Sequence, residues 1–138
     1  MAASEMDRVE TDHVSFSVFS QSLRALSYDA AAACHEMGNY NSAGEIWYEL
    51  TSSFPYVSDS PTIGLSAEQR IALAALVSKL RELPEEAMAP KGIMPTSHTA
   101  CLIAMNHPAW IPLREQAAKL VEMLEPAIKR SQEFLNSL

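Results

Sequence analysis

The chain has 138 residues, of which 48% are hydrophobic and 20% charged, and its formal net charge is −7. A chain of this length and apolar content can build the core of one domain without metal or disulfide support. The acidic excess repels phosphate groups and anionic lipid, which argues against nucleic acid and membrane surfaces as partners. With only 4 glycines and many straight-chain residues, the composition favours an all-α fold.

Two further features concern where such a protein resides. Cys34 and Cys101 lie in unrelated segments without a Cys-x2-Cys pair, which is more typical of reduced thiols than of a disulfide framework; a single bridge between them is the alternative. Residues 1–12 lack the basic and apolar regions of a secretory signal, and the longest apolar run, 71–77, is too short to span a bilayer. The sequence therefore predicts a soluble cytoplasmic protein.

The first half of the chain predicts a helical hairpin. Residues 1–12 are polar and acidic, so we expect a flexible tail there, followed by one helical domain over 13–138. The first helix is predicted over 14–37, because apolar side chains recur there every three or four residues. Gly38-Asn39 breaks this helix, since both residues tolerate the left-handed conformation. A second helix over 41–53 should pack antiparallel to the first.

A connector bounded by Pro55 and Pro61 separates this hairpin from a third helix. Ser66 and Gln69 form a capping-box pattern, in which each side chain binds the backbone amide of the other residue. The helix that follows, over 67–83, is almost continuously apolar or small. We therefore expect it to be buried on more than one side, as a central helix would be.

The remaining third of the chain predicts two more helices. Three prolines and a glycine make 84–95 a loop, with one helical turn at 85–88. Thr96 or Ser97 can cap a short helix that ends at Met105, and a long terminal helix begins near Pro112 and bends at Pro126. The sequence thus predicts about five helices, with the antiparallel hairpin packed into a small bundle.

Gly38, Tyr40, Ala43, Trp47 and Pro55 form the pattern Gly-x-Tyr-x2-Ala-x3-Trp-x7-Pro. This stretch resembles the second half of a single tetratricopeptide repeat. In that family a glycine turns the chain, aromatic and small residues let two helices approach closely, and a proline ends the unit. The resemblance covers about residues 24–55, and no second copy of the pattern occurs. It implies a binding scaffold rather than a reaction centre.

Four residues are candidates for partner contacts. The resemblance places Tyr28 and His35 on the inner face of the first helix, which such repeats offer to peptides; the alternative is that both are half-buried packing residues. The lysine and asparagine that carboxylate-binding repeats use are absent there. Trp110 lies in a stiff proline-bounded segment, where it either anchors a partner or plugs the core. Met94 offers an adaptable contact in the loop over 84–95.

Two residue pairs are candidates for chemistry. His98 and Cys101 share a helix face and could bind zinc or form a thiolate–imidazole pair for catalysis. The sequence does not indicate the further zinc ligands or the third group that would orient the pair. The alternative is that Cys101 is buried and inert. Arg8-x4-His13 has the spacing of a helical family of ribonucleases and their antitoxin partners, although it falls in the expected tail. We expect no metal and no cofactor.

These features together predict a non-enzymatic protein–protein interaction module, an adaptor or chaperone-like subunit that binds a helix or peptide in a groove between helices. A homodimer through the same surfaces is compatible with the apolar content. Two alternatives stay open. One is an immunity or antitoxin-type protein whose acidic surface shields a basic toxin, and the other is a nuclease-like helical-bundle enzyme that uses the histidines and cysteines named above.

Overall fold

The computed structural model describes residues 2–37, 41–89, 92 and 97–138, with side chains from residue 7 onwards. Within these residues the chain forms seven helices and no strand, which confirms the all-α fold. Two more helices are present than the five expected, because the first predicted helix is divided and the turn at 85–88 counts as one. The helices are α1 (Ala2–Ser27), α2 (Ala30–Glu36), α3 (Ser42–Asp59), α4 (Ala67–Leu80), α5 (Glu85–Met88), α6 (His98–Met105) and α7 (Trp110–Asn136).

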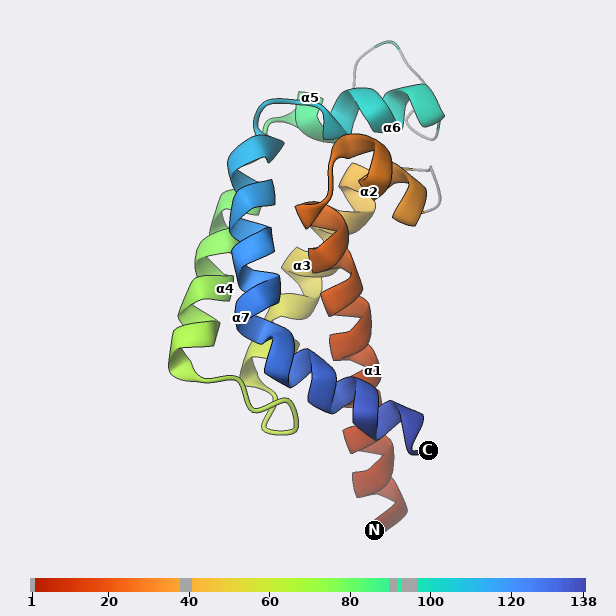
Figure 1. Cartoon of the computed structure of the whole chain (residues 1–138), viewed down its shortest axis with the longest axis vertical. Coiled ribbons are helices and arrows are strands. Elements are labelled where there is room, and N and C mark those ends of the chain that lie inside the picture. Colours follow the sequence, from red (N-terminus) through yellow and green to blue (C-terminus); the bar gives the residue numbers. More distant parts are fainter. Residues whose placement is uncertain (1, 38–40, 90–91, 93–96) are drawn as a thin grey trace.

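Four helices make a bundle and three short ones cap it (Figure 1). In the bundle α1 packs against α7 and α3, and α4 closes the ring by packing against α3 and α7. The short helices α2, α5 and α6 gather at the end where α7 begins. The core is mainly apolar, as burial of one stripe from each helix requires. Its largest fully buried side chains include Phe16, Phe19, Leu23, Ile46, Leu50, Leu73, Leu76 and Leu124.

The expected flexible tail over 1–12 is helical from Ala2 onwards, so residue 13 is not a structural boundary. Tertiary contacts hold the end of this segment. Asp12 accepts a hydrogen bond from the Ser60 hydroxyl at 3.2 Å, and His13 is buried.

The first predicted helix, over 14–37, is interrupted at Tyr28-Asp29. Asp29 is the N-cap of α2, and its carboxylate accepts a hydrogen bond from the Ala32 amide at 2.8 Å. Aspartate favours this arrangement because its short side chain offers the backbone an alternative to the helical hydrogen bond. The helix that packs along α3 is therefore α1. The turn expected at Gly38-Asn39 and the packing role expected for Tyr40 lie outside the described residues.

The second predicted helix does not end before Pro55, because α3 continues through it to Asp59. Proline has no amide hydrogen, so it leaves the Thr51 carbonyl, four residues earlier, without its helical donor. Arg81 Nη2 lies 3.5 Å from that carbonyl oxygen and donates to it. A side chain at the end of α4 thus gives the Thr51 carbonyl a donor in place of the missing amide.

The third predicted helix is confirmed at its start but not in its burial. Ser66 and Gln69 form the expected capping box, with hydrogen bonds of 2.8 and 3.1 Å. However, α4 buries only one face, through Leu73, Leu76, Val77 and Leu80, and its opposite face is exposed. The expectation of a central helix is therefore wrong, because α4 has helices on one side only.

The last helix, α7, bends in its second half as expected, and Pro126 lies inside it (Figure 1). The Met123 carbonyl, three residues before the proline, accepts a hydrogen bond from Gln69 Nε2 at 3.3 Å. The bend carries the end of α7 across α1, where Ser131 reaches His13.

A disulfide joins α2 to α6. Cys34 and Cys101 are bonded with their Cα atoms 6.3 Å apart, and both are buried. The expectation of reduced thiols is therefore wrong, and the alternative of a single bridge is confirmed. The Ser42 hydroxyl lies 3.2 Å from Cys101 Sγ and is the donor of this hydrogen bond, since a disulfide sulfur carries no hydrogen.

Candidate functional site

Trp110 does not anchor a partner, because its side chain is completely buried. Its indole Nε1–H donates to the Ala87 carbonyl at 2.9 Å, which ties the start of α7 to α5. The alternative, that this tryptophan plugs the core, is confirmed. Burial of the ring together with a satisfied N–H is the usual arrangement of a structural tryptophan.

The other predicted contact residues are scattered. Tyr28 is 38% exposed at the end of α1 and lines a polar pocket. His35 is exposed in the last turn of α2. Met94 lies outside the described residues. Tyr28 thus lines a pocket of the described fold.

Of the five residues in the repeat-like pattern, Gly38 and Tyr40 lie outside the described residues. Ala43 is fully buried, as expected. Trp47 is half-buried, packs against the core, and donates from Nε1 to the Leu80 carbonyl at 2.9 Å. Its indole therefore links α3 to the end of α4, whereas Pro55 does not end the helix as the family pattern requires.

Neither pair proposed for chemistry is assembled. Cys101 is bonded to Cys34 and so offers no thiolate, and His98 is exposed. Arg8 is exposed, whereas His13 is buried between α1 and α7. No group of three or more histidine, cysteine, aspartate or glutamate side chains is placed to hold a metal ion within the described residues.

His13 instead makes a structural contact between α1 and α7. Its Nδ1 and the Ser131 hydroxyl share a hydrogen bond of 2.8 Å, and its ring stacks on Phe134 with centroids 4.3 Å apart. Desolvation by burial lowers the pKa of His13 below its ordinary 6.5, and the neighbouring Asp12 carboxylate opposes this shift. The ring is therefore held neutral in the helix interface.

A shallow groove of about 410 Å³ lies between α3 and α4. It is lined by Phe54 and Ser58 from α3 and by Ala67, Arg70, Ile71 and Ala74 from α4. Ile71 is 71% exposed, and Ala74 and Ala75 beside it are exposed as well. An apolar stripe of this kind on a helix normally lies against another element. This one faces outwards from the described fold.

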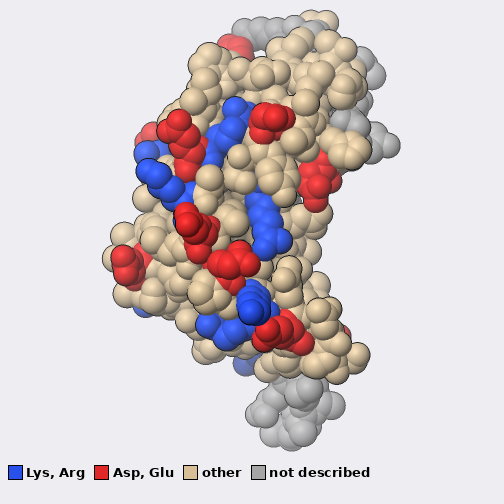
Figure 2. Space-filling view, viewed as in Figure 1, with Lys and Arg blue, Asp and Glu red and all other residues tan. Residues whose placement is uncertain are grey.

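Charge around this groove is uneven. The whole of α3 carries three carboxylates, Glu45, Glu49 and Asp59, and no lysine or arginine. On the face shown in Figure 2, acidic and basic side chains alternate over α4 and α7, and few charges lie over α6. None of these three carboxylates is among the residues that line the groove, where Arg70 of α4 is the charged side chain.

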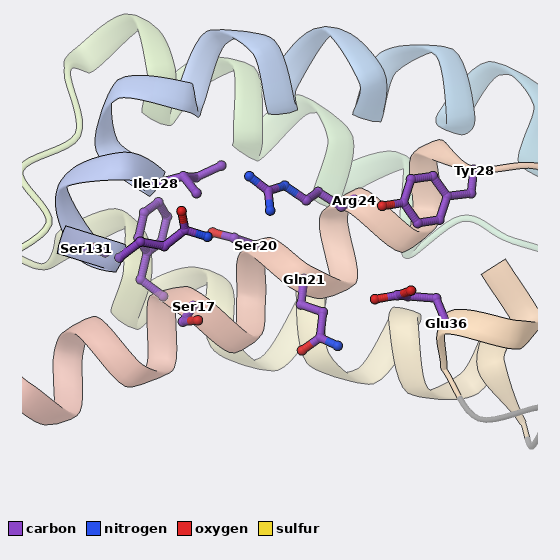
Figure 3. Close-up of a pocket in the computed structure, with 10 residues that line it drawn as sticks. Ser17, Ser20, Gln21, Arg24, Tyr28, Glu36, Ile128 and Ser131 are labelled. Atoms are coloured by element: carbon purple, nitrogen blue, oxygen red, sulfur yellow. The ribbon is translucent and has the colours of Figure 1, made fainter. Parts of the chain in front are cut away.

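A second, polar pocket of about 230 Å³ lies where α1 meets α2 and α7 (Figure 3). Its lining residues come mostly from α1 and the residue after it: Phe16, Ser17, Ser20, Gln21, Arg24 and then Tyr28, with Glu36 from α2 and Ile128, Ser131 and Gln132 from α7. Sequence reasoning singled out only Tyr28. The signal that could have found the others is a polar stripe at three- and four-residue spacing, Ser17, Ser20, Arg24 and Tyr28, beside the apolar stripe of the same helix.

Among the described residues no helix combines the length and the apolar character that crossing a membrane requires. Comparisons with protein-family models, with curated proteins and with solved structures found no match for this chain.

Proposed function

We propose that this protein is a protein–protein interaction module, and that the groove between α3 and α4 binds an amphipathic helix of its partner. The observation that carries the proposal is the second apolar face of α4. Ile71, Ala74 and Ala75 lie on the side of the helix opposite its core stripe, and the first two line the groove together with Phe54 of α3. A partner helix would bury this face by the groove-binding mode that helical domains commonly use.

The charge distribution favours a basic partner. The chain as a whole carries −7, and α3 holds three carboxylates and no lysine or arginine, although none of the three lines the groove itself. Lysine or arginine residues beside the apolar stripe of a partner helix would complement this field and speed association. The same property would suit an antitoxin-like protein that shields a basic partner, so the salt dependence of binding is part of the test.

The tetratricopeptide resemblance enters the proposal only as a scaffold. The packing of α1 along α3 and the position of Trp47 between α3 and α4 support a repeat-like hairpin. The interruption at Asp29 and the continuation of α3 through Pro55 depart from the family pattern. A single adaptor or chaperone-like unit closed by other helices, rather than an array of repeats, is the form we propose.

The proposal is tested by selecting helical peptides from a displayed library on the intact, oxidised protein, and then measuring affinity for Ile71→Glu. We expect selected peptides to be amphipathic and basic, and Ile71→Glu to weaken their binding at least about tenfold by placing a charge against the apolar stripe. Ile111→Glu is the matched control, because Ile111 is 52% exposed on α7, outside the groove. Circular dichroism of both variants checks that the fold is kept.

Three outcomes would refute this docking site. One is that Ile111→Glu weakens binding as much as Ile71→Glu, and another is that neither variant has an effect. The third is that Ile71→Glu dissociates a dimer of the free protein, which would assign the groove to a second copy of the chain. Strong weakening of peptide binding at high salt, without any effect of Ile71→Glu, would favour the antitoxin-like shield instead.

The Cys34–Cys101 bond bears on the cellular location, because the redox state of cysteines depends on the compartment. A cytoplasmic location, which the sequence predicts, would normally keep both thiols reduced, whereas a buried disulfide is typical of an oxidising compartment. We therefore propose that the functional protein is the oxidised form. Trapping free thiols in cells lysed directly into denaturant, which exposes both buried side chains, tests this: we expect no labelling of the two cysteines, and full labelling would contradict it.

A further inference from the structure

We propose that the polar pocket between α1, α2 and α7 binds a small zwitterion, namely an amino acid whose carboxylate meets Arg24 and Ser20 and whose ammonium group faces Glu36. This site is separate from the groove on α3 and α4 and does not depend on it. The inference rests on an unpartnered buried hydroxyl, an under-used guanidinium and a carboxylate at the other end of the same pocket.

Ser20 supplies the first observation. It is only 3% exposed, its Oγ has no hydrogen-bond partner among the described residues, and it lines the pocket. A buried hydroxyl without a partner is costly, and native proteins satisfy almost all such groups. A hydroxyl donor directed into a polar pocket is suited to an acceptor such as a carboxylate oxygen.

Arg24 supplies the positive end. In Figure 3 its guanidinium extends toward Ser20 and Ile128. Its ion pair with Glu125 is long, at 3.8 Å, and solvent-exposed, with the two side chains 35% and 58% accessible. Such a pair contributes little, so the planar fork of N–H donors is free to bind a carboxylate in a bidentate manner.

The carboxylate of Glu36 disfavours an anionic ligand that lacks a positive group. This carboxylate reaches the pocket from α2, near Tyr28 and away from Ile128 (Figure 3). A phosphate or a bare carboxylate would be attracted at one end and repelled at the other, whereas an ammonium group turns that repulsion into attraction. With Phe16 and Ile128 as apolar walls, the pocket matches a ligand that has two charged ends and a short aliphatic body.

The size of the pocket sets the length of that body. At about 230 Å³ it is smaller than the sites that hold drug-sized molecules, yet it exceeds the cavity of roughly 150 Å³ that holds one benzene ring. An amino acid of a few carbon atoms fits this range, and a peptide of several residues does not.

The test is a titration of the intact, oxidised protein, followed by amide and methyl NMR shifts. The probes are glycine, 3-aminopropanoate and 4-aminobutanoate, each compared with the acid that lacks the amine: acetate, propanoate and butanoate. Inorganic phosphate is added as a separate arm. We expect one amino acid to shift resonances of residues around the pocket and to bind at least about tenfold more tightly than its matched acid.

Substitutions test which end of the pocket binds the carboxylate of the ligand and which binds its ammonium group. Arg24→Gln should weaken binding of the amino acid about tenfold to a hundredfold, because it removes charge-assisted hydrogen bonds. Glu36→Gln should weaken the amino acid but not the matched acid, a change in selectivity that loss of folding cannot imitate. Arg8→Gln and Glu10→Gln are matched controls on the same helix, outside the pocket, and should leave both affinities unchanged.

Ser20→Ala gives an independent readout. It should weaken binding while leaving the melting temperature of the free protein unchanged or raised, since it removes an unsatisfied buried hydroxyl. The proposal is overturned if no amino acid of the series binds at concentrations up to about 10 mM, a range that still detects millimolar affinities. It is equally overturned if phosphate or the plain acids bind as well as the amino acids, or if Ser20→Ala destabilises the free protein.

Discussion

Removing the Cys34–Cys101 disulfide should strongly destabilise the protein. The bond closes a loop over a sequence separation of 67 residues, and chain-entropy theory assigns to a loop of this length about 4 kcal/mol of stabilisation at 25 °C, mainly by restricting the unfolded chain. A domain of this kind has a total stability of about 5–15 kcal/mol. The bridge therefore accounts for a large share of the stability, and it holds α2 against α6 at the capped end of the bundle.

The assay is urea denaturation of the oxidised protein, the reduced protein and the Cys34→Ala/Cys101→Ala double variant. We expect the free energy of unfolding to fall by about 4 kcal/mol on reduction and by a similar amount in the double variant. The m-value should rise, because an unbridged unfolded chain exposes more surface. Reductant should have no effect on the double variant, which serves as the control. A loss below about 1 kcal/mol with an unchanged m-value would refute the loop-entropy argument.

Three further predictions concern single side chains. Burial lowers the pKa of His13, so as the pH falls below about 7 the unfolded chain is protonated at this residue before the native protein is, and the free energy of unfolding should decrease. His13→Gln should lose less stability than the unchanged protein when the urea midpoints at pH 7.5 and 5.5 are compared. An equal loss in the two proteins would contradict this. Trp110→Phe should cost about 1–3 kcal/mol in chemical denaturation, because it leaves the buried Ala87 carbonyl without its donor, and a loss within error would show that the hydrogen bond is replaced. Ser66→Ala should cost about 1 kcal/mol by removing the cap of α4, whereas an unchanged unfolding midpoint would mean that the cap is dispensable.

The local parts of the fold could be predicted from the sequence. The apolar period marked α1, α3, α4 and α7, the Ser66–Gln69 pair marked where α4 begins, and Pro84 marked the turn that became α5. These features depend on hydrogen bonds and propensities within a few residues, so the chain displays them directly. Even the break before α2 has a local cause, the Asp29 cap, although the longer apolar period concealed it.

The candidate sites depended on contacts between distant segments. Whether α4 is buried on one side or two depends on how many helices pack around it, and the repeating pattern of alanine and leucine is compatible with both. Pro55 lies inside α3, and the donor that the Thr51 carbonyl lacks comes from Arg81 at the end of another helix. The polar pocket likewise needs α2 and α7 beside α1.

The sequence by itself determined that this protein is helical and where α3, α4, α5 and α6 begin to within one residue. Only the tertiary structure decided that Trp110 is enclosed, that Cys34 meets Cys101 and that Ile71 faces outwards. The physical reason is the range of the interactions. Helix formation is governed by neighbours three or four residues apart, whereas burial and pairing are properties of the space between helices, which no short window of sequence contains.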